Sequence, residues 1–179
     1  MKPTDHVIFC YPNIDDKHQI LFTYLQAGLV QGEAAAYATC ESPEEVKDSM
    51  RRFGIDIDKF EASGALHIMA AEDWYIPGNS FSLQRIKTHW KRLYDKSTGK
   101  GFKGLRVAGD MTGFFQNGLV SELIEYEKSL HKILDLPITA ICAYDYVDIK
   151  KCQSNLFMEL FDAHAHVILI GSKDGVLAS

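Results

Sequence analysis

Short apolar segments alternate with longer segments of helical periodicity along the chain, and this alternation constrains the fold more than any other feature. The first segment, His6–Tyr11 (HVIFCY), is almost entirely apolar, as a strand covered on both faces is. Further strands are predicted at Ala34–Cys40, Ala65–Ala71, Gly104–Gly109, Ile138–Tyr144 and His166–Ile170. Helices are predicted between them at Lys17–Gly28, Ser42–Gly54, Phe81–Tyr94, Leu119–Leu134 and Asn155–His164. This order is typical of an α/β protein with a doubly wound, mainly parallel sheet flanked by helices.

The second predicted helix has clear signals at both of its ends. Ser42-Pro43-Glu44-Glu45 is a capping box with proline at the first helical position. Gly54 follows the last apolar residue of the helical pattern and is expected to end the helix.

Size and composition are those of one globular domain spanning residues 1–179. The formal net charge is −5 and basic residues gather only in the short segment Lys96–Lys103, which argues against direct binding to nucleic acid. No apolar run approaches the roughly 20 residues of a membrane span, and the first residues lack the core of a secretion signal. We therefore expect a cytoplasmic protein without a membrane partner. The four cysteines form no C-x-x-C pair and are expected to be free thiols.

The turn after the first predicted strand is the place where a phosphate-binding loop, G-x-x-x-x-G-K-[ST], would lie. The chain instead reads YPNIDDKH from Tyr11 to His18. Lys17 falls at the place of the loop lysine, but Asp15 and Asp16 stand where bare backbone N–H groups should face a phosphate. Because two carboxylates repel an anion, we predict no nucleotide cofactor and no ATP binding at physiological concentrations.

A second glycine-rich segment, Gly99–Gly104 (GKGFKG), matches the G-x-G-x-x-G pattern of dinucleotide-binding sites. That fingerprint has to follow a strand and open a helix, so that the pyrophosphate meets the helix N-terminus. Here the segment follows a predicted helix and leads into a predicted strand. We therefore interpret it as a glycine-capped connection between the two.

Open α/β sheets bind ligands beyond the carboxyl ends of their strands. In this chain those ends carry Tyr11, Asp73-Trp74-Tyr75, Asp110-Met111-Thr112 and Tyr144-Asp145-Tyr146. Aromatic walls with a few carboxylates suit a small-molecule pocket, and we expect Tyr11, Tyr75, Asp110 and Tyr144 to converge around a cavity of roughly 300 Å³ or more. The alternative is that these aromatic residues only cover the loops.

A metal site finds little support in the spacing of histidine and cysteine. His6 and Cys10 share one face of a strand, but about 13 Å separates their Cα atoms, so they cannot bind one ion together. Cys142 and His164 could join them only through the fold, because no local ligand spacing is present. We therefore expect core roles for these residues and predict no metal ligands.

Catalytic chemistry is also weakly indicated, and we expect that the protein is not an enzyme. There is no G-x-S-x-G elbow, and Glu125 and Glu127 fall on different sides of their predicted helix. Asp145 is the best-placed acid–base residue, although a carboxylate at a strand end also suits capping. Arg106 lies inside an apolar strand, where an unpaired charge is costly, and we predict Glu125 or Asp145 as its partner.

A series of short motifs follows in a fixed order along the chain. They are His6-x-x-x-x-Tyr11, the Gly32-Glu33 turn, Ser42–Glu45 (SPEE), Gly54–Asp58 (GIDID), Glu72–Tyr75 (EDWY), Gly104–Met111 (GLRVAGDM), Glu125–Glu127 (EYE), Cys142–Asp145 (CAYD) and the His164–Gly171 ending. In this order they resemble the MEDS domain, the sensory domain of methanogens and of the dichloromethane-responsive repressor of methylotrophs. Phe22–Glu72 also resembles the circadian-clock branch of RecA-like ATPases.

The resemblance implies a RecA-like domain that has lost its phosphate loop and senses small hydrocarbon derivatives. The matching positions are His6, Tyr11, Trp74, Tyr75, Arg106, Asp110, Met111, Glu125, Tyr126, Cys142, Tyr144, Asp145 and His164. Of these, the ligand-binding residues are expected to be Tyr11, Trp74, Tyr75, Arg106, Asp110, Met111, Cys142, Tyr144, Asp145 and His164. The chain departs from the family pattern at Asp110, where glutamate is common, and at Ala165, where proline is usual.

The resemblance also implies a signalling partner. Relatives are commonly fused to a kinase or a DNA-binding domain, so this domain is expected to act on a separate output protein, such as a kinase or transcription regulator, when a small molecule binds. The sequence does not decide whether the protein forms a homodimer. Two alternatives to the sensor are a residual nucleotide-dependent or hydrolytic enzyme that uses Lys17, Asp110 and Asp145, and a metal or redox sensor. The latter would use Cys10, Cys142, His6 and His164.

Overall fold

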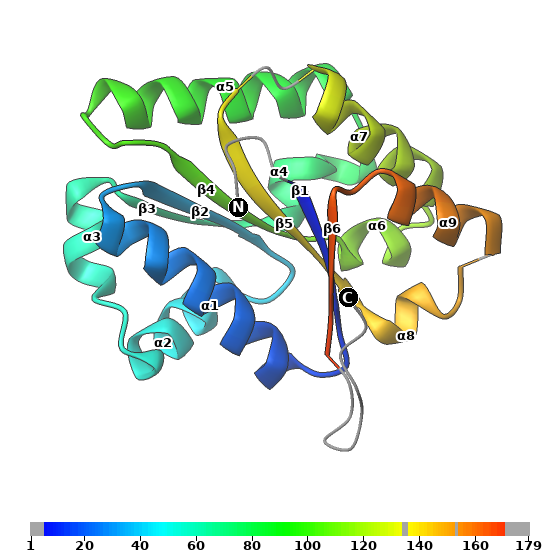
Figure 1. Ribbon diagram of the computed structural model, residues 1–179, viewed down its shortest axis with the longest axis horizontal. Helices are drawn as coiled ribbons and strands as arrows, with labels where there is room; N and C mark the ends of the chain where they lie inside the picture. Colours follow the sequence, from blue (N-terminus) through cyan, green and yellow to red (C-terminus); the bar gives the residue numbers. More distant parts are fainter. Residues whose placement is uncertain (1–5, 134–135, 153, 171–179) are drawn as a thin grey trace.

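Each predicted strand is present in the computed structural model, which describes residues 6–133, 136–152 and 154–170 (Figure 1). The strands are β1 (His6–Tyr11), β2 (Ala34–Thr39), β3 (Leu66–Ala70), β4 (Leu105–Asp110), β5 (Ile138–Asp145) and β6 (His166–Leu169). The longer helices are α1 (Ile14–Gln31), α2 (Pro43–Phe53), α5 (Leu83–Gly99), α7 (Val120–Ile133) and α9 (Ser154–Asp162). The shorter ones are α3 (Ile57–Ser63), α4 (Ala71–Tyr75), α6 (Thr112–Gln116), α8 (Tyr146–Ile149) and the 3-10 turn η1 (Pro77–Asn79). Leu134, the predicted end of the α7 helix, lies outside the described residues.

The strands form one six-stranded sheet in the order β3-β2-β4-β5-β1-β6, and every neighbouring pair is parallel. Helices α1, α2 and α3 cover one face, and the helices from α4 onward cover the other (Figure 1). The predicted doubly wound α/β fold is therefore confirmed. Within the residues described, no helix combines the length and apolarity needed to cross a bilayer.

Side chains alternate between the two faces along each strand, and this gives the sheet two separate apolar cores. In the pairing of β1 with β5, Tyr11 lies beside Asp145, and Cys10 lies beside Tyr144. Tyr11 therefore packs in the core under α1, whereas Tyr144 packs in the core on the opposite face. Two tyrosines near the carboxyl ends of neighbouring strands are thus separated by the thickness of the sheet.

The predicted helix ends are largely present. Gly54 ends α2 in the left-handed conformation, with φ 101°. The Gly99–Gly104 segment joins α5 to β4, and Gly101 has φ 92°, which confirms a helix-to-strand connection. The predicted capping box at Ser42 is wrong in its detail, because the Ser42 side chain makes no capping hydrogen bond. Helix α2 begins with Pro43 at its first position. The carbonyl of Ser42 accepts the first helical hydrogen bond, from the Val46 N–H at 3.0 Å.

Three strands run almost directly into short helices that were not predicted. Helix α4 follows β3 without a gap, α8 follows β5 in the same way, and α6 begins two residues after β4. Helices of four or five residues are too short to show a repeating apolar pattern in the sequence. They matter for function because α4 carries Trp74 and Tyr75 of the predicted ligand-binding set, and Met111 and Asp145 directly precede α6 and α8.

Candidate functional site

The predicted ligand-binding residues do not form one group. Tyr11 and Asp110 lie beside α1, and the aromatic core of the other face contains Trp74, Tyr75 and Met111. Glu127 is surrounded by Cys142, Tyr144 and His164. Arg106 lies at the amino edge of the sheet, and Asp145 caps α8. Tyr11 and Tyr144 lie on opposite faces of the sheet, so the four tyrosine and aspartate side chains expected to converge do not line one cavity.

Lys17 is buried against two carboxylates at the carboxyl edge of the sheet. Its Nζ donates to Oδ2 of Asp110 at 2.9 Å and lies 2.7 Å from Oε1 of Glu41. Burial alone would lower the pKa of Lys17, but the negative charge of Asp110 and the hydrogen bonds to both carboxylates raise it above its usual value. The lysine at the place of the phosphate-loop lysine is therefore charged and neutralised within the fold.

Glu41 connects this cluster to the protein surface. Its Oε1 also lies 3.0 Å from Nε2 of His18. Burial would raise the pKa of Glu41, but the hydrogen bonds from His18 and Lys17 and their positive charges lower it to about 2. Glu41 was not predicted as a site residue, although it directly follows the end of a strand and its cysteine.

Tyr75 has a packing role on the other face. Its ring centroid lies 5.5 Å from that of Tyr126 and 5.8 Å from that of Phe114. Its hydroxyl touches the backbone of β4, because a Cβ added at Gly109 would lie 2.4 Å from it. Trp74 packs on Trp90 at a centroid distance of 4.6 Å. Tyr75 and Trp74 therefore pack within the aromatic core on this face, whereas the alternative to a pocket had been that such residues cover the loops.

Glu127, which was not predicted as a site residue, is the centre of a buried polar cluster with His6, Cys142 and His164, three of the residues named for the alternative of a metal or redox sensor. Its Oε2 lies 2.9 Å from Nε2 of His6 and 3.5 Å from Nε2 of His164. The thiol of Cys142 donates to the same oxygen at 3.6 Å, and the hydroxyl of Tyr144 donates to Oε1 at 2.5 Å. The sequence feature that could have identified Glu127 is its position within the apolar stripe of α7.

The electrostatics of this cluster depend on the histidines. Burial would raise the pKa of Glu127, but the positive charges of His6 and His164 and the hydrogen bonds from His6 and Tyr144 lower it to about 2. Burial and the Glu127 charge raise the pKa of the Cys142 thiol well above its usual range. His6 was expected in a core role, and it is buried with its Nε2 2.9 Å from Sγ of Cys142.

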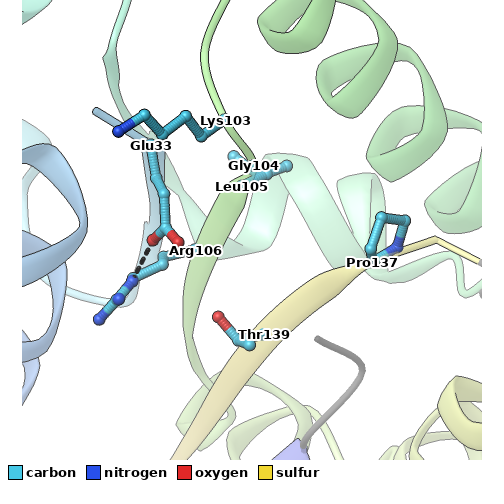
Figure 2. A pocket seen from close by; sticks show the side chains of 7 residues that line it. All are labelled: Glu33, Lys103, Gly104, Leu105, Arg106, Pro137 and Thr139. Carbon is cyan, nitrogen blue, oxygen red and sulfur yellow. Dashed lines mark hydrogen bonds and ion pairs between the residues drawn. The ribbon is translucent and has the colours of Figure 1, made fainter. Parts of the chain in front are cut away.

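Arg106 lies at the opposite, amino edge of the sheet, where its partner is Glu33. Figure 2 shows the ion pair between Nε of Arg106 and Oε2 of Glu33, and the guanidinium also donates to Gln31 at 3.2 Å. A carboxylate partner was correctly predicted, but the choice of Glu125 or Asp145 was wrong. Glu125 is exposed on α7, and Asp145 ends β5 at the far edge of the sheet.

Both residues of this ion pair line the pocket drawn in Figure 2. It has a volume of 190 Å³ and is lined by Glu33, Lys103, Gly104, Leu105, Arg106, Pro137 and Thr139. All of these residues lie within two residues of the starts of β2, β4 and β5. Arg106 is therefore separated from the carboxyl edge, where α/β sheets bind their ligands.

A larger, mostly apolar pocket of 480 Å³ lies at the carboxyl ends of β5, β1 and β6. Its lining residues are Cys10, Tyr146, Ile149, Lys150, Cys152, Phe157, Phe161 and Leu169. The rings of Phe157 and Phe161 lie 4.5 Å apart on successive turns of α9. The volume is within the range of small-molecule sites. None of the ten predicted ligand-binding residues lines it, although Tyr146 was among the residues expected at the strand ends.

The parallel sheet, its strand order and the internally paired lysine define a RecA-like α/β domain without a phosphate loop. The family model of MEDS, the MEthanogen/methylotroph, DcmR Sensory domain, matches residues 5–165. The chain therefore belongs to the MEDS family of sensory domains, as the motifs implied. A search of curated proteins gives no match.

Solved structures share the fold. The chain is similar to a KaiC-like protein from the hyperthermophilic archaeon Pyrococcus horikoshii OT3, with a TM-score of 0.64 and 14% identity over 92% of this chain and 70% of that one. It is also similar to an uncharacterized protein from Pyrococcus horikoshii in complex with an unknown peptide, with a TM-score of 0.69 and 14% identity over 93% of this chain and 77% of that one. At this identity the similarity shows the fold alone.

Proposed function

We propose that this sensory domain is non-enzymatic and binds a small organic molecule in the apolar pocket between the α8–α9 region and the ends of β1 and β6. The observation that carries the proposal is the pocket itself, with its volume of 480 Å³ at the carboxyl edge of a parallel sheet. Membership of a sensory family supports the role of the domain.

The lining of the pocket favours a compact ligand that is mainly apolar. Phe157, Phe161 and Leu169 offer carbon surfaces, and Cys10 is a buried thiol. Lys150, whose Nζ lies 5.0 Å from the centroid of the Tyr146 ring, is the cationic group of the lining. A short hydrocarbon derivative with one polar or halogen substituent fits this composition, because most of its surface would contact carbon and its substituent could face Lys150.

The pocket walls connect ligand binding to an exposed surface. Val147 on α8 and Met158 on α9 are 58% and 56% exposed, and they belong to the same two helices that line the pocket. A ligand that shifts α8 and α9 would change this apolar surface, on which a separate kinase or transcription regulator could dock. The size of such a switch is limited by the difference in ligand affinity between the two states.

The Lys17 cluster disfavours the enzymatic alternative. Nucleotide chemistry would need Lys17 to leave two carboxylates, each within 3 Å of its ammonium group, in order to reach a phosphate. Removing one partner from a buried ion pair is strongly unfavourable. A small apolar ligand in the other pocket requires no such rearrangement.

The test is a titration with dichloromethane, methanol and bromoethane, followed through the backbone amide signals of ¹⁵N-labelled protein. We expect dichloromethane or bromoethane to shift the amide signals of α8, α9 and the end of β1, with saturation. In Cys152→Trp, whose indole would fill the pocket, these shifts are lost. The control is Met158→Trp, which places the same indole on the exposed face of α9.

Two outcomes would contradict the proposal. One is a set of saturable shifts centred on Lys17 and Asp110 and not on α8 and α9. The other is an equal response in wild type and Cys152→Trp, because a filled pocket cannot bind the ligand.

A further inference from the structure

Four side chains with metal-binding atoms meet in the core on the α7 face of the sheet. His6 opens β1, Glu127 lies on α7, Cys142 lies in β5, and His164 precedes β6 by two residues. One ligand atom from each residue lies within 4.8 Å of all the others. The side chains of His6, Glu127 and His164 are 4%, 0% and 0% exposed. Imidazole nitrogen, thiolate sulfur and carboxylate oxygen are the donors that Zn²⁺ uses in proteins.

Four of the six distances between these atoms are within about 0.7 Å of those of a tetrahedral site, and the other two are no longer than 4.8 Å. Zn²⁺ bonds of roughly 2.0–2.3 Å place neighbouring ligand atoms about 3.3–3.8 Å apart. Oε2 of Glu127 lies 2.9 Å from Nε2 of His6, 3.5 Å from Nε2 of His164 and 3.6 Å from Sγ of Cys142. His6 and Cys142 are also 2.9 Å apart. An outward movement of roughly 0.4–0.7 Å by His6 brings these distances into the tetrahedral range.

Two further contacts orient the ligands as metal sites require. Nδ1 of His164 lies 2.6 Å from the backbone carbonyl of Leu160, so this nitrogen donates its proton there. In the neutral imidazole, Nε2 then carries the lone pair, and it is the nitrogen that faces Glu127. Tyr144 donates to Oε1 of Glu127 at 2.5 Å, which directs Oε2 toward the other ligands. Hydrogen bonds of this kind fix the tautomer and orientation of metal-binding residues.

Charge balance points the same way. A thiolate and a carboxylate neutralise the two charges of a Zn²⁺ ion, and two neutral imidazoles complete a four-coordinate shell with no net charge. Such a complex can remain in the core without an additional counter-charge. Binding releases the thiol proton of Cys142 and any proton shared between the histidines and Glu127.

We propose that His6, Glu127, Cys142 and His164 bind one Zn²⁺ ion as a structural site. The ion would tie β1, β5 and α7 to the segment that precedes β6. All four positions are filled by protein atoms, which is typical of structural zinc sites and leaves no position for a substrate. This site is separate from the apolar pocket, and neither proposal depends on the other.

The test uses tag-free protein produced in cells grown with added Zn²⁺ or, separately, with added Co²⁺. We expect about one equivalent of metal per chain by elemental analysis. The cobalt protein should show the visible bands of tetrahedral Co²⁺ and a thiolate-to-cobalt charge-transfer band in the near ultraviolet. The zinc protein should unfold about 10 °C above the same protein after unfolding and refolding with chelator. Protein that refolds only with Zn²⁺ present would equally support the site.

Matched cysteine variants identify the sulfur ligand. Cys142→Ser should lose the charge-transfer band, whereas Cys10→Ser, which removes another buried thiol on the same face of the sheet, should keep it. Wild-type protein with less than a tenth of an equivalent of metal and no cobalt bands would overturn the proposal. A charge-transfer band that survives in Cys142→Ser would also overturn it. Because the first of these results comes from wild-type protein, the test does not depend on the folding of a variant.

Discussion

The ammonium group of Lys17 lies 2.9 Å from the carboxylate of Asp110, and both side chains are only 1% exposed. Glu41 completes the cluster at 2.7 Å from the same ammonium group. In this fold the residue at the place of a phosphate-loop lysine is therefore held by internal partners. The ammonium group that would contact a nucleotide phosphate is buried in an ion pair.

Because Lys17 is paired inside the fold, the protein is predicted not to bind ATP. Binding would have to separate Lys17 from both carboxylates and bring a polyanion next to Asp15 and Asp16, so we expect no measurable affinity. Calorimetric titration with Mg²⁺ and ATP checks this. A dissociation constant below about 100 μM, which corresponds to some 5.5 kcal/mol of binding, would refute it.

The buried pair should also show strong coupling in stability. Lys17→Met leaves the Asp110 carboxylate without its cation and is expected to lower the free energy of unfolding by about 3–5 kcal/mol. Adding Asp110→Asn removes the uncompensated charge and keeps the amide oxygen that can accept from the Thr112 N–H. The double variant should therefore be more stable than Lys17→Met alone. Urea unfolding measures both changes, and purely additive losses would speak against the pair.

Stability should fall at acid pH through Glu41. Its pKa in the folded protein is lowered to about 2 from an ordinary value of 4.5. The contribution of Glu41 is therefore complete above pH 4.5 and is lost as the pH falls toward 2. Because Glu41 is partly exposed, we expect a loss of roughly 1 kcal/mol. Glu41→Gln should show a shallower decline in the free energy of unfolding between pH 5 and 2, and parallel curves for the two proteins would contradict this.

Gly28 is expected to be intolerant of alanine although it lies within a helix. A Cβ added there would lie 2.5 Å from Cδ of Arg106 and 2.7 Å from its Nε. In an open helix, Gly→Ala stabilises by about 1 kcal/mol, but here it should displace Arg106 from Glu33 and destabilise the protein. In an Arg106→Ala background the same change should become stabilising. Gly99→Ala, where nothing lies within 4 Å of the added atom, is the control.

The alternation of strands and helices could be read from the sequence because it depends on local periodicity. The apolar run of β1 and the amphipathic pattern of the long helices need no knowledge of the partners that they contact. Helices α4, α6 and α8 escaped prediction because four or five residues cannot establish a period. Their strands therefore continue into packed helical turns, where loops were expected.

The arrangement of the side chains could not be read in the same way because it depends on register. Tyr11 pairs with Asp145, so Tyr144 faces the opposite side of the sheet, and a shift of one residue would reverse this. The partner of Arg106 likewise depends on strand order, since Glu33 precedes β2, the neighbour of β4. Glu127 could have been found, because a carboxylate on the apolar side of a helix needs buried partners.

The most direct test of the proposed sensor is the position of a bound ligand. Crystals soaked in dibromomethane should give anomalous bromine density in the pocket between Cys10, Phe157 and Phe161. That result would place the ligand at the carboxyl ends of β1 and β6. Bromine density beside Lys17 and Asp110, or within the aromatic core around Tyr75, with none in the pocket, would contradict the account.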